Sequence, residues 1–260
     1  GTQDNGIFKW NIRQGNTTFE NGLSRFAAIP PVKINKIMID KKGYLWIGTF
    51  AEGAYVIDPE TDKVIMHFHH KASGDKKLPE QSVSSILEYN DSLVMISTNT
   101  NIMVYNRLRH TMSYLGTSEK TTGFISSMEK DDSGHLWVST NTSLFRVNIN
   151  SKVFVQFNRV DGIRNDCFIL SASYVLPDSR ILLGATATLV AFNPASVNVS
   201  SAVPNCYITD FKVMNQSLRL DSLLKQKEIE LGPDENSISI DLSTLTFNTP
   251  YVIRYKLEGL

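Results

Sequence analysis

The chain has 260 residues, of which 42% are hydrophobic and 20% charged, so it contains enough apolar material to fold around a sizeable core. Lys and Arg together number 26, as do Asp and Glu, and the resulting net charge of zero argues against a nucleic-acid-binding surface. Apolar stretches such as 181–190 are too short to span a bilayer, and the first residues show no signal-peptide pattern.

A short unit recurs along the first 195 residues. Residues 42–49 read KGYLWIGT and residues 133–140 read SGHLWVST, and weaker copies occupy 93–98 and 180–185. If the opening Gly-Thr is counted as the end of a further copy, a small residue falls at positions 1, 48, 97, 139 and 184, with spacings of 47, 49, 42 and 45. Spacings of this size are typical of the blades of a β-propeller.

Each copy is surrounded by the same series of short alternating runs. One run, followed by a turn rich in Asp, Asn or Gly, precedes the unit, at 34–40, 83–89, 125–130 and 169–176. A second run follows the unit, at 6–10, 54–57, 102–105, 144–147 and 189–192. A further turn then leads to an outer strand, at 64–68, 112–115 and 153–157. Four short antiparallel strands per unit predict propeller blades, and the region is therefore predicted to be all-β.

The repeated tryptophans, Trp46 and Trp137, allow two interpretations. A recurring aromatic side chain is either a stacking platform for a sugar or a wedge between neighbouring blades. Both tryptophans are flanked by apolar residues inside the second strand of their unit, and this favours packing in the core.

The composition changes near residue 194, where Pro, Ser and Ala become frequent. We predict propeller blades over 1–194, a linker over 195–205 and a second module over 206–260. In the second module Ile238, Ile240 and Leu242 alternate with polar residues, which predicts a sandwich strand with one buried face. Residues 220–227 have the length of one helical turn, but a loop is the favoured interpretation.

The sequence offers little for catalysis or metal binding. His67 and His69 alternate on a predicted outer strand and so share a face; surface histidines are the favoured interpretation and a metal site the alternative. Cys167 and Cys206 allow at most one disulfide; two buried thiols are favoured, with a bridge as the alternative. No motif of a known catalytic nucleophile, zinc protease or nucleotide-binding loop occurs. We therefore predict no catalytic residue, no metal and no cofactor.

The repeat resembles a known family. The element D-x-x-G-x-L-W-I-G-T at 40–49 and 131–140, followed by GAYVID at 53–58 and SLFRVN at 143–148, is similar to the two-component regulator propeller repeat, and residues 2–11 look like the tail of another copy. Residues 161–168 and 192–194 resemble the last blade of such propellers. Stretches of 206–259, among them 255–259, resemble the immunoglobulin-like module, named after its tyrosines, that follows them.

This resemblance implies a fold and a role. The fold would be a partial β-propeller of about four to five four-stranded blades that starts in mid-blade, followed by part of an Ig-like β-sandwich. The role would be the periplasmic, ligand-sensing region of an inner-membrane hybrid two-component histidine kinase/response regulator of gut Bacteroidetes, recognising a glycan or oligosaccharide and acting on transcription. Implied partners are the ligand and the remaining blades of the same protein, with a possible homodimer through the Ig-like module and no direct nucleic-acid contact.

Strand direction predicts where a ligand would bind. In a four-stranded meander, the loops after the second and fourth strands emerge on the same face. That face collects polar and aromatic side chains suited to a polyhydroxylated ligand, and His70 and Lys77 share it. The predicted ligand-binding residues are Phe50, Glu52, Asn99, Asn101, Asn141, Arg164 and Asn165. A structural or protein-binding propeller is the main alternative, and a propeller lyase or glycan hydrolase is a further one.

Overall fold

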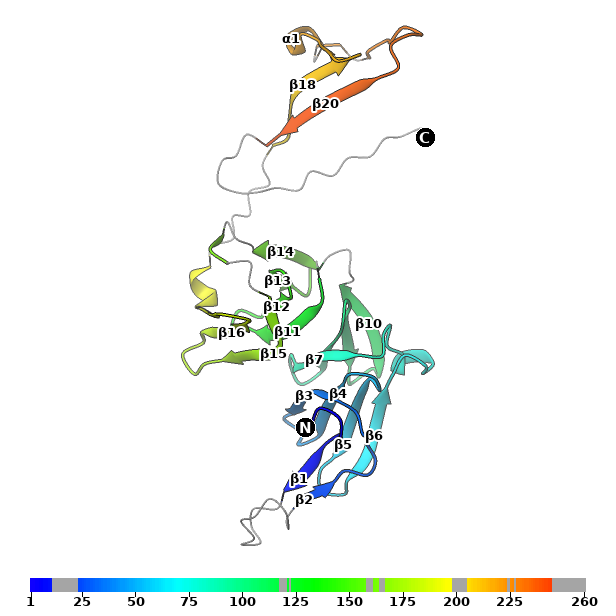
Figure 1. Ribbon diagram of the computed structural model, residues 1–260, viewed down its shortest axis with the longest axis vertical. Coiled ribbons are helices and arrows are strands. Elements are labelled where there is room, and N and C mark those ends of the chain that lie inside the picture. Colours follow the sequence, from blue (N-terminus) through cyan, green and yellow to red (C-terminus); the bar gives the residue numbers. More distant parts are fainter. Residues whose placement is uncertain are drawn as a thin grey trace. The chain divides into compact units, whose positions relative to one another are not determined.

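The computed structural model describes residues 1–10, 23–116, 121, 123–157, 161–163, 167–197, 205–223, 225–226 and 228–244. The chain divides into two compact units, Gly1–Asn198 and Val199–Leu260. Each is described by itself (Figure 1).

The first unit consists of small antiparallel sheets that follow one another along the chain. Blade 1 pairs β1 (Phe8–Trp10) with β2 (Leu23–Arg25). Three four-stranded meanders follow. Blade 2 contains β3 (Ile34–Ile39), β4 (Leu45–Thr49), β5 (Ala54–Asp58) and β6 (Lys63–Phe68), and blade 3 contains β7 (Val83–Glu88), β8 (Leu93–Thr98), β9 (Ile102–Asn106) and β10 (Thr111–Gly116). Blade 4 contains β11 (Ile125–Lys130), β12 (Leu136–Thr140), β13 (Leu144–Asn148) and β14 (Val153–Phe157). Blade 5 contains β15 (Phe168–Val175), β16 (Ile181–Ala185) and β17 (Leu189–Phe192).

These sheets confirm the predicted all-β, partial-propeller fold. Within each meander, strands that are neighbours in the sheet are also consecutive in the chain, as a propeller blade requires. The described part of blade 5 has three strands where the repeat predicts four, because the chain passes from β17 into the 3₁₀ turn η4 (Pro194–Ser196).

The aspartate of the repeat joins the first turn of the blade to its tryptophan. In blade 2, Asp40 Oδ1 accepts hydrogen bonds from the backbone N–H groups of Lys42 (3.0 Å) and Tyr44 (2.9 Å), and Oδ2 accepts from Trp46 Nε1 at 2.7 Å. In blade 4, Asp131 Oδ2 accepts from Trp137 Nε1 at 2.8 Å. The six-residue spacing of Asp and Trp is therefore set by one carboxylate that closes the turn and satisfies the buried indole.

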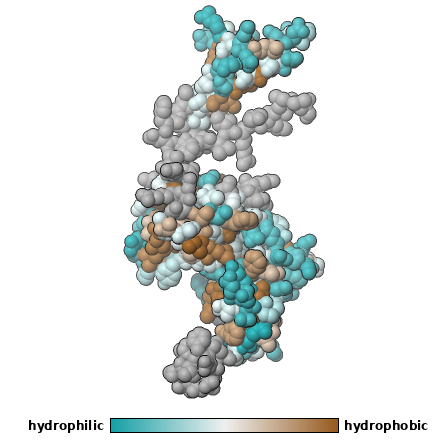
Figure 2. All heavy atoms as spheres, in the orientation of Figure 1, coloured by the Kyte–Doolittle hydropathy of each residue, from teal (hydrophilic) through white to brown (hydrophobic). Residues whose placement is uncertain are grey.

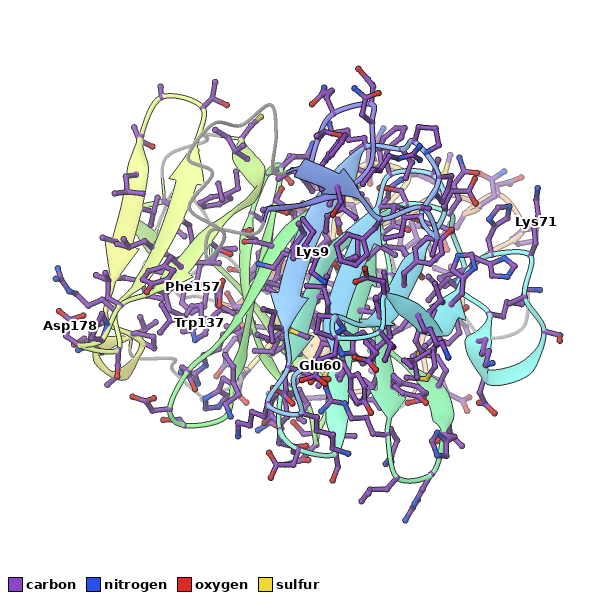
Figure 3. The ribbon with its side chains drawn as sticks, turned by 90° about the horizontal axis from the view of Figure 1, so that it is seen from below. Lys9, Glu60, Lys71, Trp137, Phe157 and Asp178 are labelled. Atoms are coloured by element: carbon purple, nitrogen blue, oxygen red, sulfur yellow. The ribbon has the colours of Figure 1, made fainter. Side chains whose placement is uncertain are left out.

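Both tryptophans pack between blades, which confirms the core interpretation. Trp46 is 1% exposed and stacks on Phe68, with ring centroids 6.0 Å apart, and it also contacts Tyr105 of blade 3. Trp137 is 2% exposed and lies beside Phe157 of its own blade (Figure 3) and Phe192 of blade 5. Each such burial contributes roughly 1.5–3 kcal/mol. The core clusters around these side chains and elsewhere in the propeller join residues of neighbouring blades.

The recurring small residue lies in the second strand of each blade, where neighbouring atoms leave little room for a larger side chain. A Cβ on Gly48 would lie 2.9 Å from Cγ1 of Val83, and one on Gly184 would lie 2.9 Å from Cβ of Ala172. The serines at the same position, Ser97 and Ser139, are buried and make side-chain hydrogen bonds to Ser84 (2.8 Å) and Ser127 (2.6 Å).

A buried ionic cluster connects blades 2 and 3. Arg107 donates from Nη2 to Asp40 Oδ2 at 2.8 Å and from Nη1 to Glu88 Oε1 at 2.7 Å, and its guanidinium lies 5.5 Å from the Trp46 ring centre. Asp40 is 4% exposed and Arg107 9%. The charged groups are therefore paired with one another, as buried charges must be.

The second unit contains a three-stranded sheet in the order β19 (Gln216–Ser217), β18 (Tyr207–Val213), β20 (Ile238–Ser243) among its described residues. Helix α1 (Leu220–Leu223) corrects the prediction of a loop at 220–227. Phe211, Val213 and Leu223 form a small core.

Two burial predictions were wrong. Ile238, Ile240 and Leu242 form the predicted strand, but they are 49%, 49% and 37% exposed, because no second sheet covers that face among the described residues. Cys167 and Cys206 are exposed rather than buried, since each lies just before the first residue of a strand. The stretch 255–259, which supported the resemblance to the tyrosine-named module, lies outside the described residues.

Candidate ligand-binding face

The loop face of the propeller carries the connections after the second and fourth strands of each blade, at 50–53, 69–82, 99–101, 123–124 and 141–143. A threonine closes the turn after the second strand. The backbone N–H and Oγ1 of Thr49 both donate to Gly53 O at 2.9 Å, and the N–H of Thr98 and Thr140 donates to Asn101 O and Ser143 O. Thr2 makes the same pair of bonds to Gly6 O, which supports the prediction that the opening Gly-Thr ends a further copy of the unit.

Phe50 presents an aromatic ring on this face. Its side chain is 53% exposed, and its backbone N–H donates to Lys33 O at 2.9 Å. Lys33 Nζ lies 5.8 Å from the ring centre, a cation–π distance. An exposed ring held by its own backbone suits stacking on an apolar sugar face.

Glu52 lies beside a stack of three rings. Its carbonyl oxygen is 2.7 Å from His67 Nε2, and the His67 ring lies between Tyr55 (centroids 3.9 Å apart) and His69 (4.5 Å). The predicted approach of His67 and His69 is thus confirmed. Desolvation and the neighbouring charge of His67 lower the pKa of His69 below 6.5, although Glu52 opposes them. No group of three or more metal-binding side chains occurs among the residues that the structure describes.

Asn101 and Asn99 differ in their roles. Asn101 Nδ2 donates to Glu80 Oε1 at 2.9 Å, and Thr100 Oγ1 donates to the same oxygen. Glu80 therefore links the connection 69–82, which precedes blade 3, to the turn 99–101 within that blade. Asn99 is half-buried, and its carbonyl oxygen accepts from the backbone N–H of Ile125. Part of the predicted binding set therefore stabilises the loop face.

Asn141 holds a second exposed aromatic residue. Its Oδ1 accepts from the backbone N–H of Phe124 at 2.7 Å, and its own N–H donates to Phe124 O. Phe124 is 59% exposed and was not among the predicted site residues. It lies one residue before the first strand of blade 4, where the blade begins on the loop face, but no recurring residue type marks this position in the sequence.

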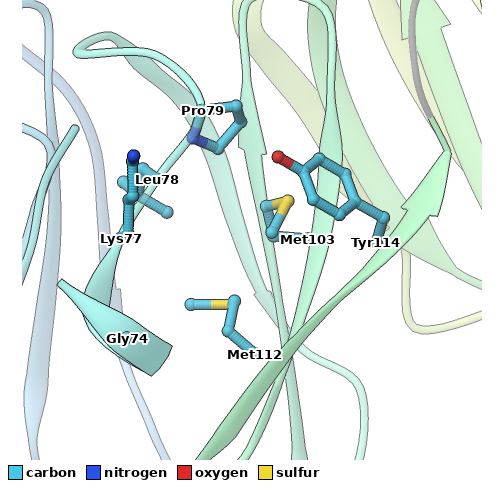
Figure 4. Close-up of a pocket in the computed structure, with 7 residues that line it drawn as sticks. All are labelled: Gly74, Lys77, Leu78, Pro79, Met103, Met112 and Tyr114. Atoms are coloured by element: carbon cyan, nitrogen blue, oxygen red, sulfur yellow. The ribbon is translucent and has the colours of Figure 1, made fainter.

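The remaining predicted residues divide into two groups. Arg164 and Asn165 lie outside the described residues. Lys77 lines a groove of about 220 Å³ between the connection 69–82 and the outer strands of blade 3 (Figure 4). The other lining residues are Gly74, Leu78, Pro79, Met103, Met112 and Tyr114.

A second hollow, of about 360 Å³, lies between the inner strands β3 and β15. The register of β15 slips between Phe168 and Ser173, and Ser171 in this bulge has a φ of 57°. Its Oγ donates to Asn35 O at 2.6 Å. Glu129 of β11 accepts from Ser173 Oγ at 2.6 Å, and burial raises the pKa of the Glu129 carboxyl. The first strands of the blades, which surround the propeller axis, therefore bring polar groups of β3, β11 and β15 together there.

One copy of the repeat matches a known family. Residues 28–51, which contain β3 and β4 with the Asp40 turn and Trp46, match the two-component regulator propeller family. Residues 28–51 are therefore similar to a two-component regulator propeller repeat. The same turn and the same tryptophan bond recur in blade 4, and the Thr-closed loops recur in blades 1 to 4.

Several proteins that resemble this chain are histidine kinases or parts of two-component systems. Histidine kinase P4 of Formosa agariphila is 23% identical over 266 residues, which cover 100% of this chain and 19% of that protein. The extracellular domain of one hybrid two-component system from B. thetaiotaomicron has a TM-score of 0.58 and 21% identity, covering 80% of this chain and 29% of that one. The extracellular domain of a second such system from the same organism has a TM-score of 0.57 and 20% identity, covering 94% and 33%.

The chain thus spans about a fifth of its curated relative and about a third of the similar solved domains. At these identities the solved domains establish the propeller fold. Within the described residues, no helix has the length and apolar character needed to cross a membrane.

Proposed function

We propose that this chain is part of the periplasmic, ligand-sensing region of a hybrid two-component histidine kinase/response regulator, and that its loop face binds a glycan or oligosaccharide. The observation that carries the proposal is the pair of exposed rings, Phe50 and Phe124, each fixed by backbone hydrogen bonds on a loop of a two-component regulator propeller. Preorganised aromatic platforms beside amide and carboxylate groups suit a polyhydroxylated ligand.

The chemistry of the loop face favours binding over turnover. Of the predicted side chains, Asn101 and Asn141 are engaged in holding loops, and Glu80 accepts from both Thr100 and Asn101. A glycosidase needs two carboxyl groups facing one another across the scissile bond. The described loop face supplies no such pair in its hydrogen-bonded clusters, so we expect an intact ligand to be released.

Signal relay is the second half of the proposal. The parent protein would pass ligand binding from the propeller through the Ig-like module to a membrane helix and kinase, with transcription as the output. Similarity to extracellular domains of hybrid two-component systems supports this route.

Calorimetric titration of the purified chain with a panel of neutral and acidic oligosaccharides tests the binding proposal. We expect at least one saccharide to bind without being cleaved and to raise the melting temperature. Phe50→Ala and Phe124→Ala should each weaken binding about tenfold, equal to about 1.4 kcal/mol.

Tyr44→Ala is the matched control, because Tyr44 is an aromatic residue that is 36% exposed in the turn at the opposite end of the blade. It should leave binding unchanged. If no saccharide binds, or if Tyr44→Ala weakens binding as much as Phe50→Ala, the proposed site is wrong.

A protein-binding or structural propeller is the second candidate. Exposed apolar side chains on blade 5 favour it: Ile169 is 48% exposed, Tyr174 61% and Leu189 63%. Figure 2 shows apolar side chains gathered over β15. We assign this surface to the remaining blades of the same protein, because blades 2 to 4 bury the matching faces against their neighbours.

A further inference from the structure

We propose that the groove beside blade 3 binds a small apolar carboxylate, a molecule with an aromatic or alicyclic body and one anionic group. This ligand would be distinct from the glycan proposed for the loop face, so each of the two proposals can be tested without the other.

The walls of the groove come from segments that the fold holds firmly. The connection 69–82 folds back on itself: the backbone N–H of Leu78 donates to His69 O, and that of Lys77 donates to Gly74 O, both at 3.1 Å. Asp75 Oδ1 accepts from the backbone N–H of Met112 at 3.0 Å, which ties this connection to β10. The groove therefore exists before any ligand arrives, and preorganisation favours affinity.

The floor of the groove is apolar. Leu78 is fully buried and Met103 is 3% exposed, and Met112 packs against the same core cluster. Figure 4 shows the methionine side chains between Lys77 on one side and the Tyr114 ring on the other. Tyr114 is 49% exposed and offers a ring face, and methionine adapts its shape to irregular apolar ligands.

The charge of the groove selects the polar end of the ligand. Lys77 is exposed and makes no ion pair within the described part of the chain. Asp75, the carboxylate two residues away, is engaged with the backbone of Met112. A ligand carboxylate near Lys77 would therefore meet an ammonium group that forms no ion pair with a side chain of the described residues.

The scarcity of polar side chains argues against a sugar here. A polyhydroxylated ligand needs several donors and acceptors, whereas the lining side chains supply one ammonium group and one phenol hydroxyl. The volume of about 220 Å³ limits the occupant to a single ring with a short acidic chain.

Titration of the full chain with 3-phenylpropionate, its neutral amide and glucuronate tests the proposal. We expect phenylpropionate to bind with 1:1 stoichiometry, and the amide and glucuronate to bind at least tenfold more weakly. Lys77→Gln should weaken phenylpropionate binding about tenfold, whereas Lys71→Gln, a lysine of the same connection that does not line the groove, should leave it unchanged.

A second variant separates the groove from general charge effects. Tyr114→Ala removes the exposed wall and should also weaken binding about tenfold, with an unchanged melting temperature of the free protein because the ring is half exposed. Tighter binding of glucuronate than of phenylpropionate, equal effects of Lys71→Gln and Lys77→Gln, or no binding at all would each overturn the proposal. Oligosaccharide binding that persists in both groove variants would leave the proposed sensor function intact.

Discussion

At the scale of single residues, the interfaces between blades depend on a few buried polar groups. Asp40 accepts hydrogen bonds from its own turn, from Trp46 and from Arg107 of the next blade. The turn and the tryptophan could be predicted from the sequence because they lie within six residues of Asp40. Arg107 was not, because it lies 67 positions from Asp40 and only the stacking of blades brings it near.

Replacing Arg107 tests this cluster. Arg107→Met leaves Asp40 and Glu88 buried without their cation, so we expect a loss of about 3–5 kcal/mol in the free energy of unfolding measured by urea denaturation. Arg180→Met is the matched control, since Arg180 pairs with Asp178 in an exposed position, and it should cost less than about 1 kcal/mol. Similar losses for the two variants would contradict the assigned role of Arg107.

Glu129 on the propeller axis gives a prediction about pH. Burial raises the pKa of its carboxyl above 4.5, while the bond from Ser173 and the charge of Lys36 act in the opposite direction. A raised folded pKa means that the fold favours the protonated form: the stabilisation is complete below the unfolded pKa and is lost as pH rises through the folded pKa. Glu129→Gln should therefore melt at a higher temperature than the wild type at pH 7.

The same comparison at pH 4 checks the sign. The difference in melting temperature between Glu129→Gln and the wild type should be smaller at pH 4, because the wild-type carboxyl becomes neutral as well. Glu60→Gln, which changes an exposed carboxylate, should have no effect at either pH. A lower melting temperature for Glu129→Gln at pH 7 would show that the carboxylate stabilises the axis.

At the scale of elements, the sequence predicted the blades well because each is built from local patterns. Alternation, Asp-Gly turns and the Leu-Trp strand all act within about fifteen residues of one another, and β3 to β14 follow the predicted runs closely. The bulge of β15 was not predictable, because its Ser171 is held by Asn35, which lies 136 positions earlier. Phe124 was missed since the residue before the first strand varies from blade to blade, with Lys33 and Cys167 at the same place.

The small residue at the end of each second strand provides a test at this scale. Gly48→Val would place a side chain 2.9 Å from Val83, and we expect overpacking to destabilise the propeller by about 1–3 kcal/mol in thermal unfolding. Gly232→Ala should be nearly neutral, because its nearest neighbour is the flexible end of Glu235, 3.6 Å away. An unchanged melting temperature for Gly48→Val would contradict the close packing of blade 2 against blade 3 at this position.

At the scale of the whole molecule, the sequence predicted a sheet face in the second unit but not its exposure. Ile238 and Ile240 lie opposite Val213 and Phe211 on one side of the sheet, and α1 helps to cover Phe211 and Val213 while the β20 residues remain exposed. Burial depends on partners beyond a local pattern, so alternation alone predicts an apolar face without predicting what covers it. The possible homodimer through this module stays a prediction.

The central claim is that successive blades present one ligand-binding face, and hydrogen exchange of the backbone amides tests it most directly. With the saccharide that raises the melting temperature most, we predict slower exchange at 50–53, 69–82, 99–101, 123–124 and 141–143, and unchanged exchange at the opposite turns, 40–44, 59–62, 90–92 and 131–135. Slower exchange at those opposite turns, or no change at either end of the blades, would contradict the account.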